Sequence, residues 1–181
     1  MRIISGKFKG KRIIAPKKLP VRPTTHMAKE GLFNILNHQY YFEELSVVDL
    51  FAGTGNISYE FASRGVPELT AVDGHAGCVQ FISKTAKELD APITPIKADV
   101  FKFLERHSDP KDLFFADPPY DFEKEQLLKI VALIFENNLL REDGVCILEH
   151  RPQIDLSDAQ FFGEKRKYGS SVFSFFYNEA S

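Results

Sequence analysis

The segment best suited to chemistry is the Asp-Pro-Pro-Tyr run at 117–120, which directly follows an apolar run at 114–116. Pro118 keeps Asp117 out of helical geometry, and two consecutive proline rings stiffen the turn. The Asp117 carboxylate and the Pro118 carbonyl can therefore be held as two fixed hydrogen-bond acceptors, with the flat ring of Tyr120 beside them. Such a pair fits an amino group that carries two N–H bonds.

This arrangement suits methylation of an exocyclic amino group on a nucleic-acid base. The lone pair of such an amine is delocalised into the ring, so the amine is a poor nucleophile until two acceptors pull its nitrogen toward tetrahedral geometry. A base extruded from its stack can rest on Tyr120, a contact worth roughly 1–3 kcal/mol. We predict that Asp117, Pro118 and Tyr120 are catalytic, on either a guanine or an adenine amine.

A second candidate site is the run 47–56, in which Asp49 leads into a turn with Gly53 and Gly55 before a predicted helix. The glycines let the backbone approach a ligand closely. Asp73 ends the next predicted strand, 18 residues beyond Gly55, where an acid can accept hydrogen bonds from both hydroxyls of a ribose. The spacing predicts a nucleoside cofactor.

Two features favour S-adenosylmethionine over NAD as that cofactor. Ser58 stands where the dinucleotide motif needs a third small residue, and an anionic Asp49 repels a pyrophosphate but suits the ammonium of a methionine. Asp99 follows the third strand and can accept from an adenine amine, cap the helix that begins near Phe101, or do both. The residues predicted to bind the cofactor are Asp49, Phe51, Gly53, Gly55, Asp73, Gly74, Asp99 and Val100.

The elements that must position these residues alternate between short apolar runs and helical patterns. Strands are predicted at 46–51, 69–73, 93–97, 112–116 and 144–149, with helices at 56–64, 76–90, 100–107 and 123–138 between them, and a hairpin is predicted at 161–177. This order predicts an α/β fold: a doubly wound, mostly parallel sheet that ends in an antiparallel hairpin. Cys78 and Cys146 are expected in the core rather than in a disulfide or a metal site.

The N-terminal segment is strongly basic. Residues 1–30 carry nine Lys or Arg and one acid, so a net charge of −2 for the chain divides into +8 and −10. Apolar–basic alternation around Gly6 and Gly10 predicts a small two-stranded ribbon, followed by a helix from Thr24 or Thr25 to about Asn37. We expect an extension at 1–40 and a catalytic domain at 41–181.

Concentrated positive charge predicts a nucleic-acid partner, although a solvated basic tail is the alternative. The residues predicted to bind the substrate are Arg2, Lys7, Lys9, Lys11, Arg12, Arg22, Thr24 and Thr25. No apolar run is long enough for a membrane span and no signal segment is visible, so we expect a cytoplasmic protein, without a resident metal and monomeric.

These residues resemble a known family, the RsmD-type bacterial 16S ribosomal RNA guanine-N2 methyltransferases, over essentially all 181 residues. The resemblance lies in residues 2–11, in 22–25 leading to 30–36, in 49–55 and in 117–120; the last two motifs are shared by many amino-methyltransferases. It implies the class I methyltransferase fold, S-adenosylmethionine as donor, and the exocyclic amine of guanine 966 as target, in 16S RNA or a 30S assembly intermediate.

By the same resemblance, residues 22–25 with Phe33 and Asn34 cover the methionine end of the cofactor. The chain departs from the family at His26, Met27 and Lys29, so no family role is carried over to them. Three alternatives remain open at this point: a DNA adenine-N6 methyltransferase, a non-catalytic RNA-binding assembly protein, and a nucleotide-dependent oxidoreductase.

Overall fold

The computed structural model describes residues 1–179. The five helices are α1 (His26–Gln39), α2 (Asn56–Ser63), α3 (Ala76–Leu89), α4 (Val100–Arg106) and α5 (Lys124–Glu136), with one 3-10 turn at Phe42–Glu44. The strands are β1 (Ser46–Leu50), β2 (Glu68–Asp73), β3 (Ile93–Lys97), β4 (Lys111–Ala116), β5 (Leu140–His150), β6 (Phe162–Tyr168) and β7 (Ser171–Tyr177). Within residues 1–179, no helix is long and apolar enough to span a bilayer.

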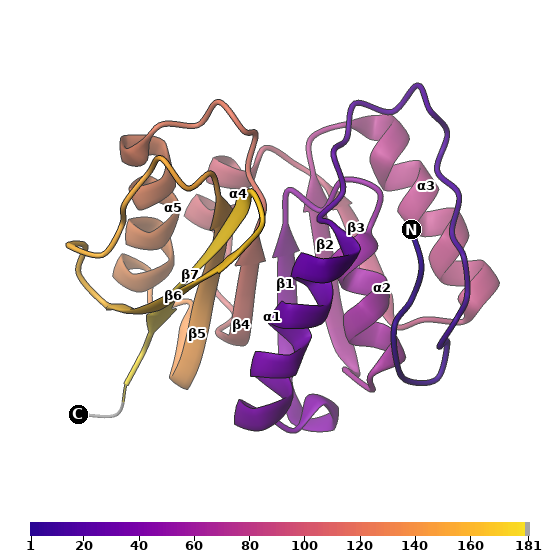
Figure 1. The fold of residues 1–181 in the computed structure, drawn as a ribbon, viewed down its shortest axis with the longest axis horizontal. Helices are drawn as coiled ribbons and strands as arrows, with labels where there is room; N and C mark the ends of the chain where they lie inside the picture. The colour runs from indigo at the N-terminus through magenta and orange to yellow at the C-terminus, as the bar shows by residue number, and fades with distance from the viewer. Residues whose placement is uncertain (180–181) are drawn as a thin grey trace.

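The strands form one seven-stranded sheet in the order β3-β2-β1-β4-β5-β7-β6 (Figure 1). The first five strands in this order are parallel, β7 is antiparallel to β5, and β6 is antiparallel to β7. The predicted doubly wound sheet with a C-terminal hairpin is confirmed. All five parallel strands end at the same edge, which is where open α/β sheets bind ligands.

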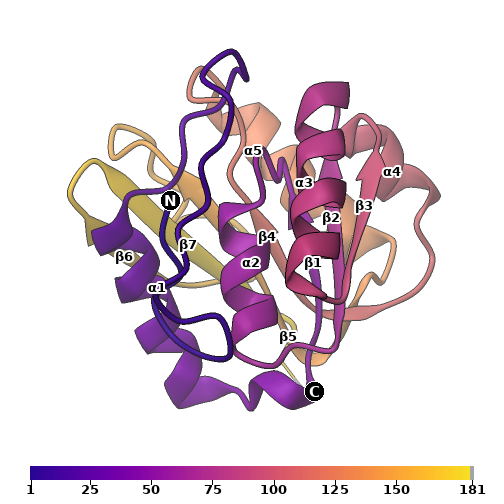
Figure 2. The same ribbon diagram turned by 90° about the vertical axis from the view of Figure 1, so that its right-hand side faces the viewer.

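Two apolar cores lie on opposite faces of the sheet, because successive residues of a strand point to opposite sides. Val47 and Phe115 belong to the core under α1, α2 and α3, whereas Val48 and Phe114 belong to the core under α4 and α5 (Figure 2). The central strands are therefore apolar on both faces, as expected of a covered parallel sheet. Cys78 and Cys146 are buried and unpaired, as predicted.

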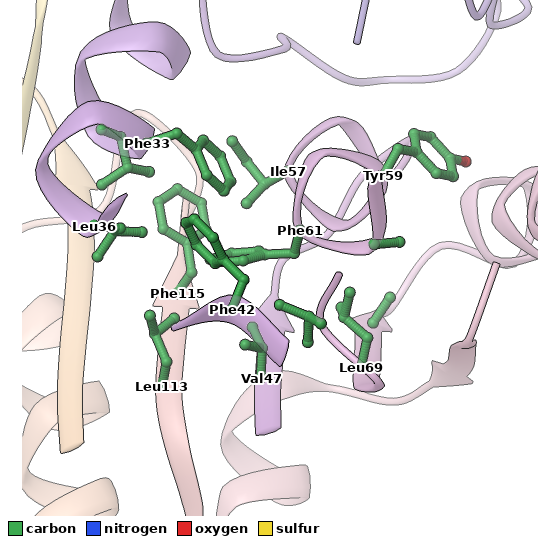
Figure 3. Packing of buried hydrophobic residues seen from close by; sticks show 14 of the residues in the cluster. Phe33, Leu36, Phe42, Val47, Ile57, Tyr59, Phe61, Leu69, Leu113 and Phe115 are labelled. Atoms are coloured by element: carbon green, nitrogen blue, oxygen red, sulfur yellow. The ribbon is translucent and has the colours of Figure 1, made fainter. Parts of the chain in front are cut away.

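Helix α1 is fixed to the sheet by aromatic packing. Phe33 is fully buried, and its ring centroid lies 4.7 Å from that of Phe61 in α2 and 6.1 Å from that of Phe42 (Figure 3). Thr25 caps the helix by accepting a hydrogen bond from the Ala28 amide, as one of the two predicted caps. The N-terminal helix thus shares a core with β1 and β4, which positions the preceding connector above the sheet edge.

The predicted N-terminal ribbon is confirmed at its ends and shorter than expected. Arg2 and Arg12 form an antiparallel β-bridge, and the Ile3 amide donates to the Lys11 carbonyl at 2.9 Å, but residues 5–10 turn instead of extending. The ribbon is short because the residues near its turn bond to α2: the Ile4 amide donates to Glu60 Oε1 at 2.9 Å, and the Lys7 amide donates to the Ser63 carbonyl at 2.7 Å. The arm is therefore a loop that is paired at its ends and docked on a helix.

Candidate active site

One acidic residue stands at or just after the carboxyl end of each parallel strand. The strand order arranges them across the edge as Asp99 after β3, Asp73 on β2, Asp49 on β1, Asp117 after β4 and Glu149 on β5. All five line one cavity of about 500 Å³, a size typical of small-molecule sites. The structure therefore brings together the two sites that the sequence predicted separately.

Two irregular segments close this cavity above the sheet edge. One is the connector at residues 20–25 and the other is the loop after β4, which includes Pro118 and Tyr120 (Figure 1). A Cβ atom at Gly53 would lie 3.2 Å from a methyl group of Val21, so the connector packs directly over the glycine turn. The basic N-terminal segment thus contributes a wall of the site.

The turn after β1 has the backbone conformation that a ligand-binding turn requires. Phe51 has a φ of 56°, which is unfavourable for a bulky residue. Gly55 has a φ of 91° but, contrary to the prediction, does not line the cavity: a Cβ atom there would lie 2.6 Å from the ring of Tyr59, so this glycine makes room for α2. The Gly53 amide donates to Asp73 Oδ2 at 2.9 Å, and the His75 amide donates to Asp73 Oδ1 at 2.8 Å. Asp73 is held in place by backbone groups while each oxygen retains a lone pair for a ligand.

Asp49 lies at the bottom of the cavity and is only 2% exposed. The Ser58 hydroxyl donates a hydrogen bond to Asp49 Oδ2 at 2.6 Å. The pKa of Asp49 is raised to about 7: burial is the largest cause, the Ser58 hydrogen bond opposes the shift, and the charge of Asp73 adds to it. The sequence-based expectation of a simply anionic Asp49 is therefore modified: near neutral pH the carboxyl titrates, and a cation entering the cavity favours its ionised form.

Asp117 and Glu149 follow the paired residues Ala116 and Leu148 on neighbouring parallel strands, so their side chains emerge side by side. Burial raises the pKa of the Asp117 carboxyl well above its usual range, the adjacent Glu149 raises it further, and Arg22 lowers it. Glu149 Oε2 accepts from the Thr24 hydroxyl at 2.8 Å, whereas Glu149 Oε1 receives no N–H or hydroxyl hydrogen bond within residues 1–179, and the Asp117 carboxyl lies within hydrogen-bonding reach of Glu149. We call Asp49, Asp117 and Glu149 the acid cluster.

The ring of Tyr120 is 56% exposed and lies at the rim of the cavity. Two cations lie near this ring: the Arg22 guanidinium is 5.2 Å from the ring centroid of Tyr120, and the Arg151 guanidinium is 5.9 Å from it. Arg151 also donates to the Tyr120 carbonyl at 2.6 Å, which fixes the loop. The rim therefore offers a stacking surface next to two cations.

The other predicted site residues divide into two groups. Phe51, Gly74, Val100, Thr24 and Thr25 line the cavity. Asp99 does so while capping α4, accepting from the Lys102 amide at 3.0 Å, which confirms its predicted cap. Arg2, Lys7, Lys9, Lys11 and Arg12 are exposed on the docked arm and do not line the cavity.

A second buried charged cluster anchors this arm; we call Lys29, Asn56, Glu60 and Arg64 the arm clamp. Lys29 Nζ donates to the Arg2 carbonyl at 2.7 Å and to Asn56 Oδ1 at 2.8 Å, and it lies 3.5 Å from Glu60 Oε1. The guanidinium of Arg64 donates to Glu60 Oε2 at 2.8 Å. Lys29, counted in the sequence among the basic groups available to a nucleic acid, is therefore a buried structural residue.

Sequence reasoning missed Glu149, Arg151 and the arm clamp. Glu149 could have been found by the rule that identified the other acids, because it ends a predicted strand at the same sheet edge. Lys29 and Glu60 lie in different helices and are 31 positions apart in the chain, and neither residue carries a local signal of burial.

The comparisons with known proteins agree with this geometry. The family model described as Conserved hypothetical protein 95 matches residues 1–177. YlbH of Bacillus subtilis is 35% identical over 164 residues, which is 87% of this chain and 86% of that protein. Ribosomal RNA small subunit methyltransferase D of Escherichia coli is 27% identical over 150 residues, which is 82% of this chain and 74% of that protein.

Among solved structures, the yhhF protein of Escherichia coli has a TM-score of 0.86 and 25% identity, covering 100% of this chain and 99% of that one. The match spans the N-terminal arm and the C-terminal hairpin as well as the central sheet. This chain belongs to the Conserved hypothetical protein 95 family, the class I S-adenosylmethionine-dependent methyltransferases of the RsmD and YlbH type.

Proposed function

We propose that this protein methylates the exocyclic N2 amine of a guanine in 16S ribosomal RNA, at the position equivalent to guanine 966. The observation that carries the proposal is that Asp117 and Pro118 line the same cavity as Gly53 and Asp73. Acceptors for an amine and a nucleoside-type pocket are thus adjacent. The name of the Escherichia coli relative, a methyltransferase of small-subunit ribosomal RNA, supports RNA as the substrate.

The residues along the sheet edge fit S-adenosylmethionine, with its adenine at the β3 end and its methionine toward β1. Asp99 would face the adenine, Asp73 would accept from the ribose hydroxyls, and Asp49 would face the methionine ammonium. The partly uncompensated acid cluster supports this fit, because a cationic ligand relieves the repulsion among its carboxyls. Asp49 beside the glycine turn is an acid, and an ionised acid repels the pyrophosphate of a dinucleotide, which argues against NAD as the cofactor.

When bound, S-adenosylmethionine supplies an electrophilic methyl group attached to a sulfonium. The Asp117 carboxylate and the Pro118 carbonyl would accept the two N–H bonds of the guanine amine and direct its lone pair into the cavity. As the nitrogen gains a methyl group it must lose a proton; a cationic ligand in the cavity favours the ionised form of Asp117, and the surroundings that raise its pKa make that carboxylate a suitable proton acceptor. Orientation of the amine supplies much of the remaining effect.

The rim and the arm would bind the RNA around the extruded base. Tyr120 offers stacking, while Arg22 and Arg151 beside it can pair with flanking phosphates. The exposed basic residues of the arm extend this positive surface away from the cavity. We therefore assign these arm residues to RNA backbone binding and not to the chemistry.

The direct test is transfer of a labelled methyl group from S-adenosylmethionine to unmethylated substrate. Naked 16S RNA and 30S particles, both from cells that lack the modification, are offered in parallel to the purified protein. Calorimetry with S-adenosylmethionine first establishes that the preparation binds its cofactor. We expect transfer to at least one RNA form; cofactor binding without transfer to either form would refute the proposal and favour a non-catalytic RNA-binding protein.

A further inference from the structure

We propose that Glu149 recognises the N1–H group of the target guanine and thereby distinguishes guanine from adenine and from other aminopurines. This inference rests on the proposed function and adds a specificity residue to the same site. It begins with the position of Glu149 on β5, the strand beyond β4 when the edge is followed away from Asp73 and Asp49. Of the five acids, Glu149 is therefore the one farthest toward the base-binding side.

The hydrogen bonding of Glu149 is incomplete in a way that indicates a missing donor. The residue is 5% exposed, and its Oε2 atom is fixed by the Thr24 hydroxyl at 2.8 Å. Its Oε1 atom is buried at the cavity wall and receives no N–H or hydroxyl hydrogen bond within residues 1–179; the group within hydrogen-bonding reach of Glu149 is the Asp117 carboxyl. In the free protein a protonated Asp117 can donate to Glu149; once Asp117 is ionised and accepts from the guanine amine, Glu149 needs another donor, and a ligand N–H is the natural one.

The orientation of Glu149 is fixed independently of any ligand. Asn56 Nδ2 donates to the Thr24 carbonyl at 3.1 Å, so Thr24 is held by its backbone while its hydroxyl holds Glu149. The free oxygen is thereby presented next to Asp117. Preorganised acceptors of this kind give a site its selectivity, since they need no rearrangement when the correct ligand arrives.

Guanine and adenine differ at the ring nitrogen next to the amine. In guanine, N1 carries a hydrogen beside the N2 amine, whereas adenine N1 carries a lone pair beside the N6 amine. With either amine held by Asp117 and Pro118, a carboxylate beside Asp117 can accept from guanine N1–H but faces a lone pair in adenine. A carboxylate oxygen accepts hydrogen bonds, so Glu149 would stabilise bound guanine and destabilise bound adenine.

The test replaces the target guanine with 2,6-diaminopurine in ligated 16S RNA. This base keeps the N2 amine but has a lone pair at N1. We expect the wild-type protein to prefer guanine by about tenfold or more in kcat/KM, the range typical of one specific base contact. In Glu149→Gln, which retains an acceptor for Thr24 and gains an N–H donor toward N1, we expect this preference to narrow by about tenfold or to reverse.

The matched control is Glu142→Gln, the same substitution on the same strand at an exposed position outside the cavity, which should retain the wild-type preference. Equal loss of activity on both bases in Glu149→Gln would overturn the proposal, because Glu149 would then act only through Asp117. Equal wild-type rates on both bases would overturn it even if the variant did not fold. Absence of wild-type activity on guanine RNA would instead refute the proposed function itself.

Discussion

The acid cluster and the arm clamp are both buried and charged, yet they differ in how their charges are compensated. In the clamp, Glu60 is fully buried and accepts hydrogen bonds from Arg64 and from two arm amides, and Lys29 lies nearby. In the acid cluster, Glu149 has a free oxygen and Asp117 lies against another carboxyl. Among residues 1–179, Arg22 is the cation that lowers the pKa of Asp117, against the effects of burial and of Glu149.

This difference indicates that the arm clamp stabilises the fold, whereas the acid cluster binds a ligand. A buried ion is costly unless paired and hydrogen-bonded, so a complete network such as the clamp serves the folded state. A buried network with unpaired groups, such as the acid cluster, lowers the stability of the folded state. Such networks are found at sites where a bound ligand supplies the missing partners. The two networks meet at Thr24, whose carbonyl bonds Asn56 of the clamp and whose hydroxyl bonds Glu149 of the cluster.

The largest expected effect is on catalysis. Asp117→Ala should lower kcat for methyl transfer by about 10²–10⁴-fold, the range for a positioned acid–base group. The free energy of unfolding should change little or increase, because the substitution removes a carboxyl held beside Glu149. Labelled-methyl assays and thermal unfolding measure both quantities; unchanged methyl transfer would remove Asp117 from the mechanism.

The clamp should show the opposite behaviour. Lys29→Met leaves Glu60 without one of its cations and should lower the free energy of unfolding by about 3–5 kcal/mol, as measured by denaturant titration. Lys84→Met is the control, because Lys84 is 77% exposed and its pair with Glu88 is worth about 0–1 kcal/mol. A comparable loss in both variants would mean that the clamp is no more than a surface ion pair.

Asp49 should link stability to pH. Its folded pKa of about 7 lies above the ordinary value of 3.8, so the folded state binds more protons and loses stability as pH rises from about 4 to 7. Asp49→Asn lacks this loss and should be more stable than wild type at pH 8 by about 2–4 kcal/mol, with little advantage at pH 4. If the difference in the free energy of unfolding between the two proteins stayed the same from pH 4 to pH 8, a buried Asp49 that titrates in this range would be contradicted.

The smallest effect concerns the arm that the clamp anchors. Truncating residues 1–14 would expose Glu60, so RNA binding is better tested by Lys7→Gln, Lys9→Gln and Lys11→Gln combined. We expect weaker RNA binding, a salt slope reduced by about 0.7–0.9 per lost phosphate contact, and unchanged affinity for S-adenosylmethionine. If the salt dependence of RNA binding were unaltered in the triple variant, the arm would be a solvated basic surface that does not contact RNA.

The sequence predicted the sheet, its hairpin and four of the five acids, because strand periodicity and carboxyl-edge positions are local signals. It did not predict the arm loop or the burial of Lys29, because their hydrogen-bond partners lie in α2 and depend on how α1 packs. It also left Tyr120 free, whereas Arg22 and Arg151 approach its ring from two separate segments. Local sequence patterns do not predict contacts between segments that are far apart in the chain.

The identity of the methylated nucleoside tests the central claim most directly. Unmethylated 16S RNA, naked and in 30S particles, is treated with wild-type protein and S-adenosylmethionine, digested to nucleosides and analysed by mass spectrometry. The acceptor pair at Asp117 and Pro118, with Glu149 beside it, predicts N2-methylguanosine as the product, absent with Asp117→Ala although that variant still binds cofactor. N6-methyladenosine in its place, or N2-methylguanosine formed equally well by Asp117→Ala, would contradict the account.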